Sequence, residues 1–167
     1  MASVTRLPDN KRPAALLQLR IDLESIRPLI WRRVVVPKTI TLAELHRVIQ
    51  IIMGWKDAHM HLFEIAGQRY GEPDPEWGMP IHSEARATLA GSLAGAKSLI
   101  YTYDFGDDWR HRIKIEKVLP PDPDLHQPIC TAARHACPPD DVGGPPGYLD
   151  FLDAMLDPNH PEHNSML

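Results

Sequence analysis

The chain has 167 residues, of which 43% are hydrophobic and 24% are charged, a composition typical of a globular protein with one domain-sized core. Its net charge of −4 argues against a protein that coats nucleic acid nonspecifically. The N-terminus lacks the apolar core of a signal peptide, no apolar run is long enough to span a membrane, and two cysteines provide no disulfide framework. We therefore expect a cytoplasmic protein, as a monomer or a small homo-oligomer, without a membrane partner.

Charge and proline are unevenly distributed along the chain. Residues 1–33 carry seven Lys/Arg and three Asp/Glu, whereas residues 140–167 carry six acidic residues and no Lys or Arg. A local basic patch is one interpretation of the first stretch, and a solvated surface is the simpler one. The 17 prolines cluster in residues 72–80, 120–128 and 138–146, which predicts ordered but irregular loops there.

The first half of the chain predicts a hairpin, a helix and a second hairpin. Residues 1–14 are a polar, flexible lead-in to a single domain over 15–167, which begins with strands at 15–23 and 29–36. Thr41 and Glu44 fit a capping box for a helix that ends at Gly54. The apolar stripe of this helix is Leu42, Leu45, Ile49, Ile52 and Met53, and we expect His46, Arg47 and Gln50 on its polar, solvent-facing side.

Residues 59–65 predict a strand that returns over 69–71. His59 and His61 share one face of it, but two histidines need a third ligand to form a metal site. Residues 72–86 form an excursion, and residues 87–96 fit either a helical turn or a strand.

The most distinctive stretch is residues 101–111, which read YTYDFGDDWRH. Alternation places Tyr101 and Tyr103 on one strand face and Trp109 and His111 on the facing strand, joined by a glycine-bearing turn. These aromatic residues are good core formers, and His111 needs a polar partner that Asp104, Asp107 or Asp108 would provide. A structural His–Asp pair and a catalytic one both remain open at this point.

A second distinctive stretch, residues 137–148 (CPPDDVGGPPGY), is called the elbow below. It leads into a helix whose predicted apolar stripe is Tyr148, Phe151, Leu152, Met155 and Leu156. The amides at the helix start would suit an anion, but Asp140 and Asp141 would repel phosphate, so a structural elbow is favoured. We expect Cys130 and Cys137 to lie in a loop, and the six residues between them do not fit a zinc knuckle. Free cysteines are the simpler interpretation, with a redox pair or a shared zinc site as alternatives.

Seven short motifs along the chain together resemble the plasmid pRiA4b ORF-3-like family, whose members are also labelled mobile-element passenger proteins of TnpR type. In order they are residues 28–33 (PLIWRR), 41–46 (TLAELH), 49–55 (IQIIMGW), 59–63 (HMHLF), 103–109 (YDFGDDW), 137–144 (CPPDDVGG) and 157–163 (DPNHPEH). The resemblance covers about residues 15–167. It implies a compact α+β fold, with a mostly antiparallel sheet of hairpins flanked by two main helices, and a further acidic segment after Leu167. It implies no mechanism.

The TnpR label implies a serine resolvase, which the residues do not support. Such an enzyme needs a nucleophilic serine among arginines and a basic helix-turn-helix at its end, whereas Ser3 and Ser25 lack that setting and the C-terminal third is acidic.

Three functions remain open, and the ligand, cofactor and metal are left unassigned. The favoured one is a noncatalytic binding or accessory module of plasmids and transposons, with a candidate binding surface at Tyr103, Asp104, Asp107, Trp109, His111 and Asp141. The second is a metal-assisted hydrolase with ligands drawn from His59, His61, Asp104, Asp107, His111, Asp140 and Asp141. The third is a nucleic-acid-binding protein that uses Arg20, Arg32, Arg33, Arg110, Arg112 and Lys114.

Overall fold

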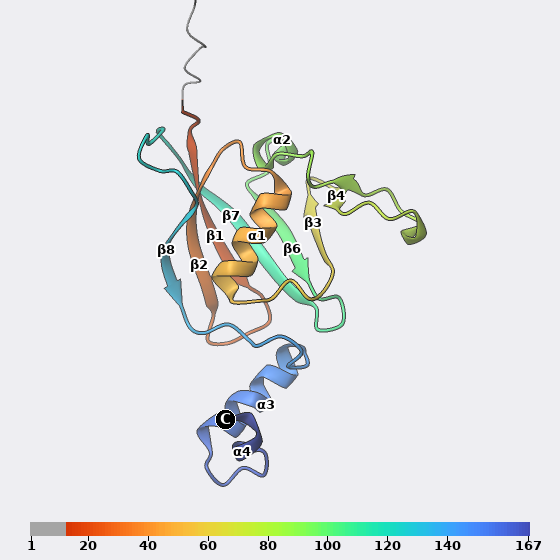
Figure 1. Ribbon diagram of the computed structural model, residues 1–167, viewed down its shortest axis with the longest axis vertical. Coiled ribbons are helices and arrows are strands. Elements are labelled where there is room, and N and C mark those ends of the chain that lie inside the picture. The colour runs from red at the N-terminus through yellow and green to blue at the C-terminus, as the bar shows by residue number, and fades with distance from the viewer. Residues whose placement is uncertain (1–12) are drawn as a thin grey trace, which may run out of the picture.

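One eight-stranded sheet organises residues 13–167, which are the residues that the computed structural model describes (Figure 1). The strands are β1 (Leu16–Leu23), β2 (Ile30–Pro37), β3 (His61–Ile65), β4 (Gln68–Gly71), β5 (His82–Ser83), β6 (Ser98–Tyr103), β7 (Trp109–Leu119) and β8 (Ile129–Arg134). Their spatial order is β5-β4-β3-β6-β7-β1-β2-β8, and only the β4–β5 pair is parallel. The predicted α+β fold with a mostly antiparallel sheet is confirmed. Most of the predicted lead-in, residues 1–12, lies outside the described residues.

Alternating side chains explain why two of the three predicted hairpins, β1–β2 and β6–β7, form, and the third, β3–β4, is also present. In β1, Leu19 and Ile21 are fully buried, while the intervening Arg20 is not. β1 pairs with β2 along its whole length and with β7 on its other side, and β6 pairs with β7 through the predicted turn. Each central strand therefore buries one face and leaves the other face partly exposed to water.

Helix α1 (Leu42–Met53) covers the buried face of the sheet, which we call the helix side (Figure 1). Both hydrogen bonds of the predicted capping box are present between Thr41 and Glu44, and Gly54 ends the helix with a φ of 78°. The predicted stripe is confirmed, since Leu42, Leu45, Ile49 and Met53 are buried and Ile52 packs against the core. Most of the core thus lies between α1 and the sheet.

The excursion between β4 and β6 contains short elements only. A 3₁₀ turn, η1 (Pro75–Trp77), precedes β5, and the stretch that the sequence left unassigned forms the short helix α2 (Leu89–Leu93), capped by Thr88. The expectation that the cysteine-bearing region is a loop is wrong for β8, which pairs with β2 at the sheet edge. Most of its side chains are exposed, so it lacks the alternation that identifies a half-buried strand.

The C-terminal helices α3 (Gly144–Leu156) and α4 (His163–Met166) extend away from the sheet, beyond the elbow (Figure 1). Tyr148 is buried, and Phe151 and Leu152 pack against the core, as predicted. Leu156 is 80% exposed, so its place in the predicted apolar stripe is wrong. Within residues 13–167, no helix combines the length and the apolar character needed to cross a bilayer.

Candidate functional site

The floor of the site is the helix-side face of the β6–β7 hairpin. Tyr101 pairs with His111 and Tyr103 pairs with Trp109, so the predicted neighbours do meet. None of the four side chains is more than 1% exposed. Tyr103, Trp109 and His111 therefore belong to the core beneath the site and offer no exposed binding surface themselves.

His111 is a core residue without a carboxylate partner. Its Nδ1 lies 3.1 Å from the carbonyl oxygen of Tyr101, and its Nε2 has no hydrogen-bond partner within residues 13–167. The expected pairing with Asp104, Asp107 or Asp108 is thus not made. Burial lowers the pKa of His111 to about 4, so the ring is neutral at physiological pH.

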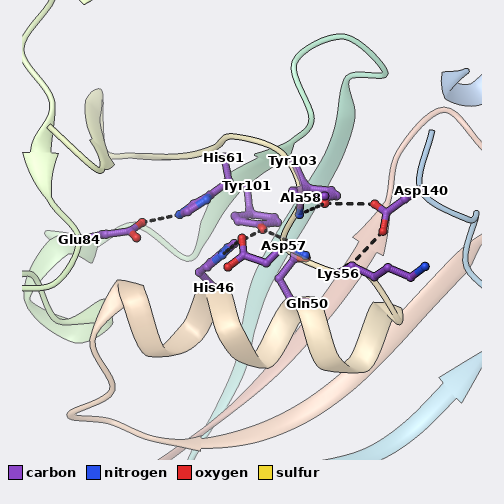
Figure 2. A network of polar contacts seen from close by, with 10 residues as sticks. All are labelled: His46, Gln50, Lys56, Asp57, Ala58, His61, Glu84, Tyr101, Tyr103 and Asp140. Carbon is purple, nitrogen blue, oxygen red and sulfur yellow. Dashed lines mark hydrogen bonds and ion pairs between the residues drawn. The ribbon is translucent and has the colours of Figure 1, made fainter. Parts of the chain in front are cut away.

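A closed ring of hydrogen bonds surrounds His46, which the sequence interpretation wrongly placed in solvent (Figure 2). Gln50 Nε2 donates to Tyr101 Oη at 3.1 Å, and Tyr101 Oη lies 2.8 Å from His46 Nδ1. His46 Nε2 lies 2.8 Å from Asp57 Oδ1, and the Asp57 amide donates to Gln50 Oε1 at 2.8 Å. Because Tyr101 Oη accepts from Gln50, its own proton is free to be donated to His46 Nδ1, and the Asp57 carboxylate can only accept from Nε2. A neutral His46 therefore carries its proton on Nε2.

Helical spacing could have identified these two buried polar residues. His46 follows Leu42 by four positions and precedes Ile49 by three, so it borders the buried stripe, and Gln50 lies one turn after it. Both residues are only 5% exposed.

His61 lies against His46 and has a carboxylate partner of its own. The two imidazole rings stack with their centroids 3.5 Å apart and an interplanar angle of 9°. His61 Nε2 lies 2.7 Å from Glu84 Oε2, and both of these side chains are less than 10% exposed. Glu84 lies in the proline-rich excursion, where no sequence pattern marked it. Figure 2 shows the stacked pair between the two carboxylates.

Burial disfavours the charged forms of three side chains near the centre of this network, those of His46, Tyr101 and Tyr103. It lowers the pKa of His46, with the neighbouring His61 acting in the same direction. It raises the pKa of Tyr101 far above its usual value and that of Tyr103 to about 12, so both phenols stay protonated. His46 and the two phenols can therefore donate or accept hydrogen bonds without carrying charge.

A pocket of about 310 Å³ opens beside the stacked histidines, between α1, the loop before β3 and the β4–β5 excursion. Among residues 13–167, its lining contains Asp57, Glu72 and Glu84 and one arginine, Arg47. It further includes His46, His59, His61 and the indole of Trp77. Pockets with a few converging polar groups are the usual places where small molecules bind.

His59 lines this pocket and also belongs to a second cluster, with Asp104 and Asp141. His59 Nε2 is 2.7 Å from Asp141 Oδ1 in the elbow and 3.5 Å from Asp104 Oδ2 in the hairpin turn. These three residues were all among the predicted hydrolase ligands. The prediction that His59 and His61 share one face of a strand is wrong, because β3 begins at His61 and His59 lies in the loop before it; the two histidines also belong to different clusters.

The remaining predicted aspartates hold the elbow against the body of the protein. Asp107 Oδ2 accepts the amide of Gly143 at 3.1 Å. Asp140 accepts the amide of Lys56 and the hydroxyl of Tyr103, each at 3.1 Å. Both aspartates therefore have structural partners, and His111 is the one predicted hydrolase ligand that lies within the core.

The arginines proposed for nucleic-acid binding do not form one exposed stripe. Arg32 is buried on the helix side, where it donates to backbone carbonyls and to Cys137 Sγ. On the other face of the sheet, Arg33 pairs with Glu116, while Arg110 and Arg112 share Glu24. Arg20 and Lys114 both lie within 4 Å of Asp22. Carboxylates thus neutralise much of this surface.

Both cysteines are free, as the simpler interpretation predicted. Cys130 is exposed on β8, and Cys137 contacts Arg32 and Met53. Burial raises the pKa of the Cys137 thiol, although Arg32 opposes this effect. A raised pKa does not favour the reactive thiolate that redox chemistry requires.

Comparisons with known proteins agree with this architecture. The chain is 42% identical over 156 residues to a Sinorhizobium fredii (strain NBRC 101917 / NGR234) protein named "Uncharacterized protein y4hQ". This match covers 92% of this chain and 80% of that protein. It is also similar to the crystal structure of MM3350, a protein of unknown function from Methanosarcina mazei Go1, with a TM-score of 0.85 and 35% identity over 93% of this chain and 89% of the other. The family model described as "Plasmid pRiA4b ORF-3-like protein" matches residues 15–167, so the chain belongs to the plasmid pRiA4b ORF-3-like family.

Proposed function

We propose that the protein is a noncatalytic binding module that takes a small organic cation, such as an amine or a guanidinium compound, into the helix-side pocket. The observation that carries this proposal is the buried pair of stacked histidines, which holds two carboxylates, Asp57 and Glu84, at the pocket wall. Burying the side chains of His46, His61 and Glu84 is unfavourable unless their hydrogen bonds are satisfied, and here partners, including the exposed Asp57, lie beside an open space.

Charge and shape indicate a cation as the ligand. Among the described lining residues, three carboxylates against one arginine give the pocket an excess of negative charge, and burial lowers the pKa of His46, which disfavours a positive charge on that ring. Trp77 adds an aromatic face, which attracts cations through its π electrons. The ligand would be a compound small enough for about 310 Å³.

Isothermal titration calorimetry with agmatine, putrescine and choline tests this proposal. We expect at least one of them to bind the natural protein and to bind at least about tenfold more weakly to Glu84→Gln, which keeps the shape of the side chain but removes its charge. Asp153→Asn, on the exposed side of α3, is the matched control and should bind like the natural protein. Failure of all three compounds to bind, or equal binding by the Glu84 variant, would contradict the proposal.

Metal-assisted hydrolysis is the second candidate, favoured by the position of His59 between two aspartates at the rim of the same pocket. Its test is the hydrolysis of bis(p-nitrophenyl) phosphate and p-nitrophenyl acetate with added Mn²⁺ or Zn²⁺. Catalysis should disappear in Asp104→Asn, and equal rates in the variant and the natural protein would exclude this site.

The other proposals have weaker support. Nucleic-acid binding would have to use the outer sheet face, where the arginines already have carboxylate partners. We keep a cytoplasmic, reducing location as a proposal that the two free cysteines support. An accessory role on mobile elements is likewise a proposal, supported by the plasmid origin in the family's name.

A further inference from the structure

We propose that His59, Asp104 and Asp141 bind one divalent transition-metal ion, which fastens the elbow to the body of the domain. The proposal concerns a different ligand from the organic cation of the pocket, and either can fail without the other. It starts from one observation: each residue offers a ligand atom, and these three atoms lie within 4.8 Å of one another.

The three side chains come from parts of the chain that are far apart in sequence. His59 lies in the loop before β3, Asp104 begins the turn between β6 and β7, and Asp141 lies in the elbow. Sequence proximity therefore does not explain their convergence. An ion held by all three would connect the loop after α1, the hairpin turn and the C-terminal segment.

The separations between the ligand atoms fit one ion. Ligand atoms held at 2.0–2.2 Å from a tetrahedral ion lie about 3.3–3.6 Å apart. His59 Nε2 and Asp104 Oδ2 are 3.5 Å apart, which meets this requirement directly. His59 Nε2 and Asp141 Oδ1 are 2.7 Å apart, so Asp141 must move outward by several tenths of an ångström. Its side chain is 73% exposed, which leaves room for that movement.

The Nε2 atom of His59 is buried beside two carboxylates but forms no hydrogen bond with them. Nε2 is screened from solvent and, within residues 13–167, forms no hydrogen bond of acceptable geometry, although two carboxylates are close to it. A shielded imidazole nitrogen between two carboxylate oxygens is a coordination environment for a cation.

The carboxylate of Asp104 is already oriented for coordination. Its Oδ1 accepts the amides of Gly106 at 3.0 Å and Asp107 at 3.2 Å, which leaves Oδ2 directed to His59. Such outer hydrogen bonds fix the orientation of ligands at metal sites. Asp104 is only 8% exposed, so its position is set by the fold and not by solvent.

The donor set indicates the kind of ion. One imidazole and two carboxylates suit Zn²⁺, Mn²⁺ or Fe²⁺, and their two negative charges would balance a divalent cation. Three protein ligands leave at least one coordination position for water or another molecule. The ion would therefore remain accessible from the pocket that His59 lines.

The other histidine cluster is less suitable for an ion. His46, Asp57 and His61 also approach within 4.8 Å, but the two imidazole rings are nearly parallel and stacked. A metal binds in the plane of an imidazole ring, so parallel rings must rotate before both can hold one ion. Both nitrogens of His46 also have partners already.

The test is metal content by elemental mass spectrometry, with Zn²⁺ and Mn²⁺ titrations by calorimetry, on protein purified without a histidine tag. We expect about one ion per chain, bound at least about tenfold more weakly by His59→Ala and Asp141→Asn. His126→Ala, at an exposed site elsewhere, is the matched control, and His61→Ala separates the two clusters. Because the Asp141 side chain is largely exposed, Asp141→Asn remains informative if His59→Ala fails to fold.

Limited proteolysis provides a second readout that does not depend on activity. The elbow of the natural protein should be cleaved more slowly when Zn²⁺ or Mn²⁺ is added, and Asp141→Asn should show no such protection. The proposal is overturned if the natural protein binds neither ion, if both site variants bind as tightly as the natural protein, or if only His61→Ala loses the ion.

Discussion

At the scale of single residues, His111 is the side chain whose charge the fold opposes most clearly. It is fully buried, and its pKa of about 4 lies below the value of about 6.5 for an unfolded chain. Between these two values the unfolded state binds the proton and the folded state does not. This depressed pKa therefore has almost no effect on stability above pH 6.5, where both states are neutral, and it destabilises the folded state progressively as the pH falls from 6.5 toward 4.

We predict that the free energy of unfolding falls by about 2 kcal/mol between pH 7 and pH 5 because of this one group. Urea denaturation at both pH values measures the change. His111→Phe should lose this component of the pH dependence, whereas the exposed His126→Ala should retain it. An unchanged pH dependence in His111→Phe would show that other groups produce it.

Arg32 and Arg33 are adjacent in sequence and point to opposite faces of β2. Arg32 is 8% exposed and donates to the carbonyls of Trp31, Ile52 and Arg134, of which Ile52 lies in the last turn of α1. Its positive charge thus lies at the negative end of the helix dipole. The sequence interpretation treated it as one of several surface arginines.

We predict that Arg32→Met lowers the free energy of unfolding by about 3 kcal/mol, since buried carbonyls lose a charged donor. Arg33→Met is the matched control, and it should have a much smaller effect because its pair with Glu116 is exposed to solvent. Chemical denaturation of both variants measures the difference. Equal losses would contradict the distinct roles of the two arginines.

At the scale of secondary-structure elements, the elbow depends on a close backbone contact at Gly144. A Cβ atom there would lie 2.7 Å from the carbonyl oxygen of Asp107, and the residue has a φ of +68°. Gly78 has nearly the same φ, +65°, but a Cβ atom there would meet nothing within 4 Å. Comparing an alanine substitution at Gly78 with one at Gly144 therefore separates the effect of the backbone conformation from the effect of crowding by Asp107.

We predict that Gly78→Ala lowers the free energy of unfolding by about 1 kcal/mol, from the unfavourable φ alone. Gly144→Ala should lower it by clearly more and should expose the elbow to protease, because the elbow can no longer contact the hairpin turn. Thermal denaturation and limited proteolysis of the two variants provide the comparison. Indistinguishable variants would mean that the Asp107 contact contributes little.

The elements that could be predicted from the sequence are those that bury one face. The alternation in β1, β6 and β7 and the stripe of α1 follow directly from burial, so these elements were identified. β8 is an exposed edge strand and α4 is a single turn, and neither has a hydrophobic pattern. Both elements were therefore missed.

The candidate site was only partly predictable for a related reason. Asp104, Asp141 and His59 were recognised by residue type near glycine turns, although their mutual contact was not. Glu84 and Asp57 lie in irregular segments, and their roles follow from contacts with His61 and His46 that no periodicity encodes. Hydrophobic patterns predict which faces are buried, but not which polar groups meet there.

At the scale of the whole molecule, the sheet separates two surfaces of different character. The outer face carries exposed ion pairs such as Arg33–Glu116. The helix side carries the core and the stacked histidines (Figure 2), and the pocket and the His59 cluster lie beside them. The features that could bind a ligand therefore lie on either side of the loop before β3: the pocket toward α1 and the β4–β5 excursion, and the His59 cluster toward the hairpin turn and the elbow.

Proton–nitrogen NMR of histidine side chains, during titration with agmatine, putrescine and choline, tests the binding proposal most directly. The account predicts saturable shifts of the His46 and His61 imidazole signals, because both rings line the pocket. The signals of the exposed His126 and His135 should stay unchanged. The absence of shifts at His46 and His61 with every compound, or equal shifts at all four histidines, would contradict the claim that this pocket is a binding site for small organic cations.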